Sequence, residues 1–357
     1  MLEVLRSGRL SLGPMLERFE RDFAAWIGIE DAVAVSSGTA ALHLAVRALG
    51  WGPGDEILTS PFSFVASANC LLYEGATPVF CDIDPVTLNL DPGAARAALS
   101  ERTAGLRAVH IFGYPAAMPA LESLAAERGL PVLEDACQAL GAVASDGRRV
   151  GTRGNAGAFA FYANKQLTTG EGGMLVPPSA EIAARARRER NQGRAPDMGR
   201  VEHQGLGFNY RLPEVGAALG VAQLERIEVL LAERARVAAL YRELVGPMEG
   251  VELPCEDRGD ERRSWFVYVV QLPEGADRDE VIAELARRGV QSKAYLPCIH
   301  LLPFYRERFG FRGGEFPVAE RVAERALALP FFTTMTADEV ERVAGALAQS
   351  LGRRVPA

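Results

Sequence analysis

Short apolar runs alternate with amphipathic stretches along the first half of the chain. The apolar runs are residues 32–35, 56–59, 77–84, 106–112 and 130–136, and the helix-like stretches are residues 14–27, 39–49, near 65–74 and 119–129. Apolar strands that each lead into a helix are typical of a mainly parallel sheet covered by helices on both faces. The pattern predicts an α/β fold whose ligands bind at the carboxyl ends of the strands.

The pattern changes in the second half of the chain. Residues 213–245 read as one long helical stretch, and a strand at 265–272 precedes a helix at 277–289 that Asp277 caps. An amphipathic helix closes the chain at residues 340–354. We expect the domain boundary inside the long helix, which gives a large domain at 1–235 and a smaller C-terminal α+β domain at 236–357.

Composition narrows the class of protein. The 357 residues are 48% hydrophobic and 24% charged, which is ordinary for a soluble globular protein. A net charge of −7 and a pI of about 5.4 argue against nucleic acid or an anionic membrane as partner. The uncharged run 57–73 contains Pro, Ser and Asn, so it is interpreted as core and not as a membrane span. The first residues lack a hydrophobic signal core, so a cytoplasmic location is expected.

The cysteines and histidines give no pattern that is typical of a metal site. Five cysteines are scattered without a Cys-x-x-Cys pair, and the four histidines have no metal-ligand spacing. We therefore expect reduced thiols and no metal. The chain also lacks a G-x-G-x-x-G after its first strand and a G-x-x-x-x-G-K-[ST] motif, which argues against a dinucleotide-binding dehydrogenase and an NTPase.

Lys165 is the first candidate for chemistry. It stands between the apolar run 158–163, which predicts a buried strand, and a Thr-Gly-Glu-Gly-Gly turn. An ammonium group resists leaving water without a partner, and one solution is an imine between the amine and an aldehyde cofactor. The alternative is a lysine at a strand end with its head in solvent, which is the commoner arrangement for an isolated lysine.

A candidate anion site lies in SSGTAALHL, residues 36–44, which follow a strand and open a helix. Free N–H groups at a helix start, with Gly38 allowing close approach and the Thr39 hydroxyl nearby, suit a phosphate. The alternative is an ordinary Ser/Thr helix cap.

Three further residues suit a ring-shaped cofactor. Asp135 ends the strand LPVLED, where a carboxylate can pair with a protonated ring nitrogen so that the ring accepts electrons. Gln138, three residues on, is a neutral donor for the same ligand, and Phe64 can lie flat on a ring. The alternatives are an Asp that caps the next segment and an aromatic that belongs to the core.

These strings occur in one order that resembles the DegT/DnrJ/StrS family of sugar aminotransferases. The resemblance covers residues 8–300 and rests on SSGTAALHLAVRALGWGPGDEILT, GATPVFCDIDPVTLNLDP, LEDACQALGA, FAFYANKQLTTGEGGML and LGFNYRLPEVGAALGVAQL. It implies the aspartate aminotransferase fold (fold type I) and pyridoxal 5'-phosphate as cofactor.

Positions in the shared strings imply roles around the cofactor ring. Lys165 resembles the Schiff-base lysine of the family, and Asp135 the partner of the pyridine nitrogen. Gln138 is similar to the residue packed by the ring and its phenolic oxygen, and Phe64 to the aromatic stacked on the opposite face.

The resemblance also implies roles for five residues away from the ring. Gly38 and Thr39 match the phosphate-binding turn. Asn209, in GFNYR, is similar to an asparagine that reaches the phosphate of the neighbouring subunit's cofactor, which implies a homodimer with shared sites. Tyr295 and His300, in AYLPCIH, are at positions where the family contacts substrate.

One position departs from the family. Many members have Ser five residues before the lysine, bonded to the phosphate, and this chain has Ala160. We expect the loss of that hydrogen bond to cost about 1 to 2 kcal/mol unless water or another donor replaces it.

The resemblance implies an aminotransferase that moves an amino group from glutamate to a nucleotide-linked keto sugar in amino-sugar biosynthesis. Relatives that remove a sugar hydroxyl carry His in place of the lysine, so Lys165 favours transamination. Two alternatives stay open: a lyase or dehydratase of the same fold and cofactor, and a non-catalytic regulator that keeps the cofactor as a ligand.

Specificity is expected to depend on the loop at residues 189–205. Its arginines, Arg190, Arg194 and Arg200, are candidates to bind a diphosphate, and a charged, solvated loop is the alternative.

Overall fold

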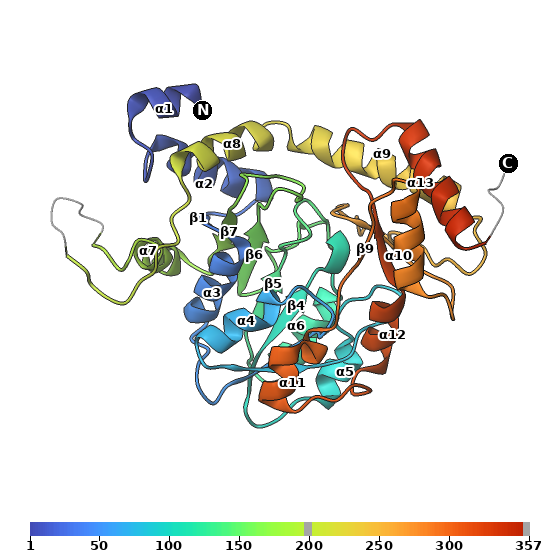
Figure 1. Ribbon diagram of the computed structural model, residues 1–357. Coiled ribbons are helices and arrows are strands. Elements are labelled where there is room, and N and C mark those ends of the chain that lie inside the picture. Colours follow the sequence, from blue (N-terminus) through green and yellow to red (C-terminus); the bar gives the residue numbers. More distant parts are fainter. Residues whose placement is uncertain (196–201, 353–357) are drawn as a thin grey trace.

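Two sheets organise the chain in a computed structural model that describes residues 1–195 and 202–352 (Figure 1). The large sheet has seven strands in the order β1-β7-β6-β5-β4-β2-β3. Their bounds are β1 Val33–Val35, β2 Glu56–Thr59, β3 Thr77–Phe80, β4 Thr103–Val109, β5 Val132–Asp135, β6 Ala156–Ala160 and β7 Gly173–Val176. Of these seven strands β7 alone runs opposite to the other six, so the predicted α/β fold with a mainly parallel sheet is confirmed.

Helices cover both faces of this sheet because its strands are apolar on both sides. One face, with Val33, Ile57, Leu133 and Ala158, packs against the first group of helices. These are α3 Gly38–Ala48, α4 Ala66–Tyr73 and α7 Ala180–Glu189. The other face packs against α2 Pro14–Ile27, α5 Pro92–Ala97, α6 Met118–Ala126 and α8 Glu214–Leu224. A short α1, Leu2–Ser7, precedes them.

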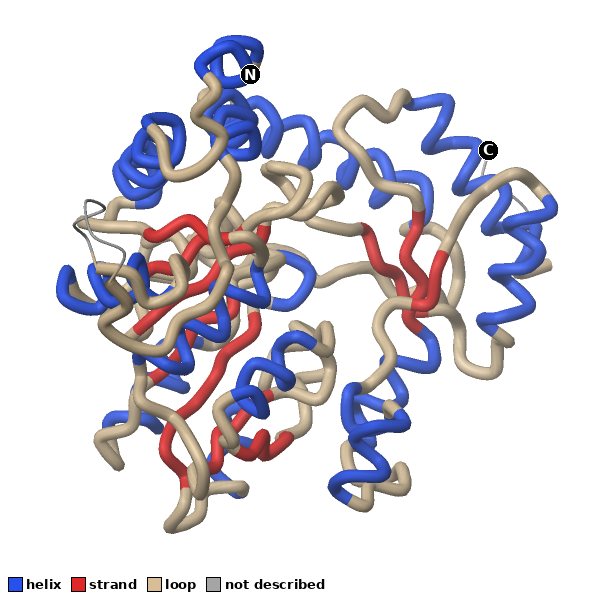
Figure 2. Tube along the Cα trace, turned by 60° about the vertical axis from the view of Figure 1, so that its left-hand side comes forward, coloured by secondary structure: helices blue, strands red, loops and turns tan. Residues whose placement is uncertain are grey.

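The second sheet is small and has its own core. Its strands are β8 Tyr268–Gln271, β9 Lys293–Ala294 and β10 Ala326–Leu329, in the antiparallel order β8-β10-β9. Around it lie α9 Ile227–Val245, α10 Arg278–Arg287, α12 Pro317–Arg325 and α13 Ala337–Ser350, whereas α11 Pro303–Phe309 packs against α4 and β3 of the large sheet. Figure 2 shows the two groups of strands apart from each other.

The pattern predicted one helical stretch over residues 213–245, and this prediction is wrong. It divides into α8 and α9 around Glu225 and Arg226, where the backbone at Arg226 leaves the helical conformation. Ile227 at the start of α9 packs in the core beneath the large sheet, whereas Val237, Tyr241 and Val245 pack in the core of the small sheet. The predicted division at residue 235 falls inside α9 and stays a prediction.

The N-terminus of α2 is capped from far along the chain. Gly13, its N-cap residue, has no side chain to accept a hydrogen bond. The buried carboxylate of Glu214, on α8, instead accepts from the backbone N–H groups of Gly13, Met15 and Leu16, each at 2.9 Å. A carboxylate is favourable there because helix N-termini carry unpaired donors and a partial positive charge.

All five cysteines are free, and two of them, Cys137 and Cys255, are only partly buried. Within the described residues, no helix is long and apolar enough to cross a membrane.

Candidate active site

A cavity of about 360 Å³ opens where β5 and β6 end and α3 begins, a size in the usual range for small-molecule sites. Seven of the nine predicted site residues line it: Gly38, Thr39, Phe64, Asp135, Gln138 and Lys165, and Tyr295, which follows β9 of the small sheet. Its position agrees with the rule that ligands of parallel sheets bind at the carboxyl ends of strands.

The start of α3 offers unpaired donors to this cavity. The Ser37 side chain caps the helix by accepting from the N–H of Ala40 at 3.1 Å. No hydrogen bond from the N–H groups of Gly38 and Thr39 is found in the described part of the chain. A Cβ on Gly38 would lie 2.5 Å from the Cβ of Ala160, so only glycine allows the helix to approach β6 this closely. The turn is thus both a capped helix start and a candidate anion site.

Asp135 is a buried carboxylate held by its own strand end and by α4. It is 2% exposed, and the Ser67 hydroxyl donates to its Oδ2 at 2.6 Å while the backbone N–H of Cys137 donates to Oδ1 at 3.2 Å. The Ser63 hydroxyl bonds to that of Ser67 at 2.8 Å. Ser67 was not predicted, because one serine within an apolar stretch carries no signal of what lies 68 residues away.

Lys165 is in a turn beyond β6 and not at the strand end. The strand stops at Ala160, and the N–H of Lys165 donates to the carbonyl of Tyr162 at 3.0 Å. Its Nζ lies 3.9 Å from the ring centre of Phe266. Burial lowers the pKa of this amine from 10.5 to about 8, against the opposing effect of Cys137 and Asp135. Such an amine is partly neutral near neutral pH and can act as a nucleophile or a base.

Gln138 and Phe64 complete the lining on two sides. The Gln138 side chain is 4% exposed, and its Oε1 accepts from the backbone N–H of Phe112 at 3.0 Å, which fixes the orientation of the amide. Phe64 is 58% exposed although it follows an apolar run, so it is not a core residue. An aromatic face left open at a cavity is available to a flat ligand.

Two predicted residues lie outside the lining. Asn209 is exposed, on a segment that pairs with Asn191. His300 is fully buried, with its Nε2 3.0 Å from Glu320 and its ring packed against Phe316. His300 is buried against Glu320 and Phe316, whereas Tyr295 lines the cavity, so the two residues predicted to bind substrate are separated.

His300 does have ligand-type neighbours, Glu315 and Glu320, whose atoms lie within 4.8 Å of one another and of the imidazole. Both carboxylates already accept backbone N–H groups of the same turn. The cluster therefore has a structural explanation in the fold of this turn.

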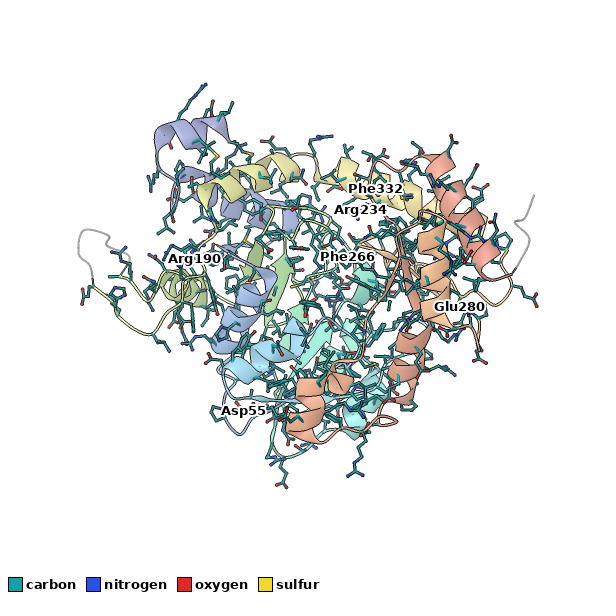
Figure 3. The ribbon with its side chains drawn as sticks, in the orientation of Figure 1. Asp55, Arg190, Arg234, Phe266, Glu280 and Phe332 are labelled. Atoms are coloured by element: carbon teal, nitrogen blue, oxygen red, sulfur yellow. The ribbon has the colours of Figure 1, made fainter. Side chains whose placement is uncertain are left out.

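Of the three arginines of loop 189–205 that were candidates to bind a diphosphate, Arg190 is contradicted by the structure. Arg190 is 5% exposed and pairs with the buried Glu20, while it also donates to the carbonyl of Ala34 at 2.6 Å (Figure 3). Arg190 is therefore neither a solvated loop residue nor free to bind a diphosphate, because its guanidinium is paired with Glu20 inside the fold. Arg194 pairs with His203 by a backbone bridge, and Arg200 lies outside the described residues.

This fold, with a lysine amine and a buried carboxylate at one end of a mainly parallel sheet, defines the class of fold-type-I pyridoxal-phosphate enzymes. The chain belongs to the DegT/DnrJ/EryC1/StrS aminotransferase family, whose model matches residues 1–348. The members of this family are pyridoxal-phosphate-dependent sugar aminotransferases, so the chain is an aminotransferase.

Individual relatives agree with the family. The chain is 38% identical to the spore coat polysaccharide biosynthesis protein SpsC of Bacillus subtilis, over 96% of this chain and 90% of that protein. It is 36% identical to the GDP-perosamine synthase of Caulobacter vibrioides, over 96% and 91%. Among solved structures, DesV of S. venezuelae is 36% identical and superposes with a TM-score of 0.92, over 99% and 94% of the two chains.

Proposed function

We propose that this aminotransferase uses pyridoxal 5'-phosphate to move an amino group from glutamate to a keto sugar linked to a nucleotide. The observation that carries the proposal is the amine of Lys165 and the carboxylate of Asp135 lining one cavity at the ends of β5 and β6. The name of the relative GDP-perosamine synthase supports a nucleotide-linked sugar as substrate.

The lining fits pyridoxal phosphate at three separate points. The unpaired N–H groups of Gly38 and Thr39 suit its phosphate, and the buried Asp135 suits a protonated ring nitrogen. The exposed face of Phe64 suits its ring. Pyridoxal phosphate, when bound, supplies an aldehyde that takes up the amino group and a ring that draws electrons from the reacting carbon.

The chain's own residues then have distinct tasks. With the cofactor bound, Lys165 Nζ, whose pKa is about 8, would take a proton from the alpha carbon of the donor. It would return that proton to the cofactor carbon that takes up the amino group. Asp135 would hold a proton on the ring nitrogen of the bound cofactor, and the Ser67 hydroxyl, which donates to Oδ2 at 2.6 Å, keeps that carboxylate in place. Gln138 would orient the ring of the bound cofactor, and Tyr295, in the lining of the same cavity, would contact the substrate.

We further propose a homodimer with shared sites. Asn209 is exposed and lies outside the cavity of its own chain, which supports a role in the cavity of a partner subunit. Sedimentation of the purified protein tests this, and a monomer that remains fully active would contradict it.

Mixing the holoenzyme with glutamate tests the reaction class. We expect the visible absorbance of the bound aldehyde form to disappear as one equivalent of 2-oxoglutarate is released, without any sugar present. A panel of UDP-, GDP- and TDP-linked keto sugars should then restore that absorbance with at least one member. A lyase or dehydratase would consume its substrate without releasing 2-oxoglutarate, and that result would replace the proposal.

Returning the missing hydroxyl is expected to tighten cofactor binding. Ala160 ends β6 beside Gly38, so Ala160→Ser places a hydroxyl next to the proposed phosphate turn. One added hydrogen bond to a charged group amounts to roughly 1.5 kcal/mol, or about tenfold in the dissociation constant. Equilibrium dialysis of both proteins against pyridoxal phosphate gives the two constants. Ala158→Ser, on the same strand but outside the lining, is the matched control, and equal affinity for Ala160→Ser and wild type would mean that another donor already serves the phosphate.

A further inference from the structure

Arg234 is a buried cation that the proposed chemistry leaves without a task. It lies on α9 and is 7% exposed. Within the described residues its guanidinium forms no ion pair, and its Nε has no hydrogen-bond partner. Burial lowers the pKa of Arg234 to about 10. A buried charge without a counter-charge costs free energy, so what its side chain contacts is of interest.

Its hydrogen bonds go to the carbonyl groups of two distant segments, and its Cζ lies 5.7 Å from the ring centre of Phe331. Nη1 donates to the carbonyl of Phe266 at 3.1 Å, and Nη2 donates to the carbonyls of Lys165 at 3.1 Å and Asn164 at 3.4 Å. One planar guanidinium thus joins the turn that carries the reactive lysine to the segment that leads into β8. Figure 3 labels Arg234 and Phe266 between the two sheets.

The two segments also meet through their side chains. The ring centre of Phe266 lies 3.9 Å from Lys165 Nζ, which is within the range of a cation–π contact. Phe266 is 2% exposed and lines the same cavity as Lys165. Lys165 and Phe266 are thus joined twice. Their side chains form a cation–π contact, and their backbone carbonyls both accept hydrogen bonds from Arg234.

We propose that Arg234 is a positioning residue for Lys165: by fixing the carbonyls of Lys165 and Phe266 on one guanidinium, it sets the place of the amine against the Phe266 ring. The inference deepens the proposed function and rests on it for the role of Lys165. The Phe266 ring shields the amine from water, and the fixed backbone keeps the amine directed at the cavity.

The geometry requires arginine in particular. Its donors project from a rigid, planar group, so Nη1 and Nη2 reach two carbonyls at a fixed separation. A lysine ammonium at the same position keeps the charge but has a single nitrogen, which cannot hold both carbonyls at those places. Gln166 also joins these segments, because its Nε2 donates to the hydroxyl of Ser264 at 3.0 Å, so loss of the Arg234 contacts removes one of two ties between them.

The test measures the reactivity of Lys165 in the full-length protein without cofactor. The chain contains only two lysines, Lys165 and the exposed Lys293, so the second serves as an internal standard. The rate of modification by an amine-specific reagent, followed by mass spectrometry of each lysine peptide between pH 6 and 11, gives a midpoint for Lys165. The titratable groups that share its cavity are Asp135, Cys137, Tyr162, Glu171 and Tyr295.

The variants are Arg234→Met, Arg234→Lys and the matched control Arg236→Met. Arg236 lies on the same helix and donates to the carbonyl of Met335 at 2.8 Å, but it contacts no residue of the cavity. In the wild type the Lys165 midpoint should lie near pH 8. In Arg234→Met we expect water to reach the amine and the midpoint to rise by about one pH unit, which lowers the modification rate at pH 8 about fivefold.

We expect the rate of the reaction with glutamate to fall in the variants in which the Lys165 midpoint rises. We expect kcat of the glutamate half-reaction to fall about tenfold in Arg234→Met and less in Arg234→Lys, with little change in KM. Arg236→Met should match the wild type in both measurements. Arg234→Lys keeps the proposal testable if Arg234→Met does not fold.

An unchanged Lys165 midpoint in both Arg234 variants, with only the melting temperature lowered, would overturn the inference and leave Arg234 a structural residue. Failure of the proposed function looks different. A wild type that releases no 2-oxoglutarate would contradict the proposed donor, yet the modification of Lys165 would still decide whether Arg234 positions the amine.

Discussion

Replacing Lys165 with alanine is expected to abolish amino transfer, with a fall in rate of roughly 10⁴-fold or more. Lys165 carries the lysine amine that lines the cavity, and the other lysine of the chain, Lys293, is exposed on β9. Without Lys165, the cavity contains no lysine to link the cofactor or to move the proton. The measurement is release of 2-oxoglutarate from glutamate, together with the visible spectrum of the purified protein.

Lys293→Ala is the matched control, since it removes the only other lysine and should leave spectrum and rate unchanged. The fold should survive Lys165→Ala, because a cation–π contact with Phe266 contributes only about 0.5 to 2 kcal/mol. An equal melting temperature then assigns the loss of rate to chemistry. Turnover retained in Lys165→Ala would remove the basis of the proposed mechanism.

Asp135→Asn is expected to keep cofactor binding and to lose about 10²- to 10³-fold in rate, in the range of a lost electrostatic contact to a transition state. An amide is uncharged, so it cannot hold a proton on the ring nitrogen as a carboxylate does. It also places an NH₂ group where Asp135 now accepts from the Ser67 hydroxyl or from the N–H of Cys137. Single-turnover kinetics with glutamate and a titration with pyridoxal phosphate separate rate from affinity.

Glu134→Gln is the matched control for that experiment. Glu134 is the neighbour of Asp135 on β5, is equally buried and accepts from His110 and from the N–H groups of Gly151 and Gly154. Its replacement should lower the melting temperature without changing the rate per folded molecule. If both variants lost rate equally, disruption of β5 would explain the effect, and Asp135 would have no separate electronic role.

The sequence predicted the sheet class because that class follows from local pattern. The runs near β2, β4 and β5 are apolar on both faces and each leads into a helix, which is how buried parallel strands are recognised. The strand order and the reversed direction of β7 depend on contacts between segments far apart in the chain. The break at Arg226 also lacked a signal, because neither glycine nor proline stands there.

Some residues of the candidate site could likewise be predicted from the local sequence, and others could not. Gly38, Asp135, Gln138 and Lys165 lie in strings that stand next to strands, so local pattern and family resemblance found them. Ser67 and Arg234 act through residues 68 and 69 positions away, and nothing in their own neighbourhood indicates those partners. The prediction for Arg190 was wrong because the charged residues beside it in the sequence are typical of a solvated loop. Its actual partner, Glu20, lies 170 residues earlier in the chain.

The capping of α2 by Glu214 has a consequence for synthesis of the protein on the ribosome. Gly13 and Glu214 are 201 residues apart, and β1, which follows α2, pairs only with β7. During synthesis α2 and β1 therefore leave the ribosome well before β7 and α8, and they gain these partners only after most of the large sheet has been translated. Until α8 emerges, the apolar side of α2 is a surface on which chaperones can act.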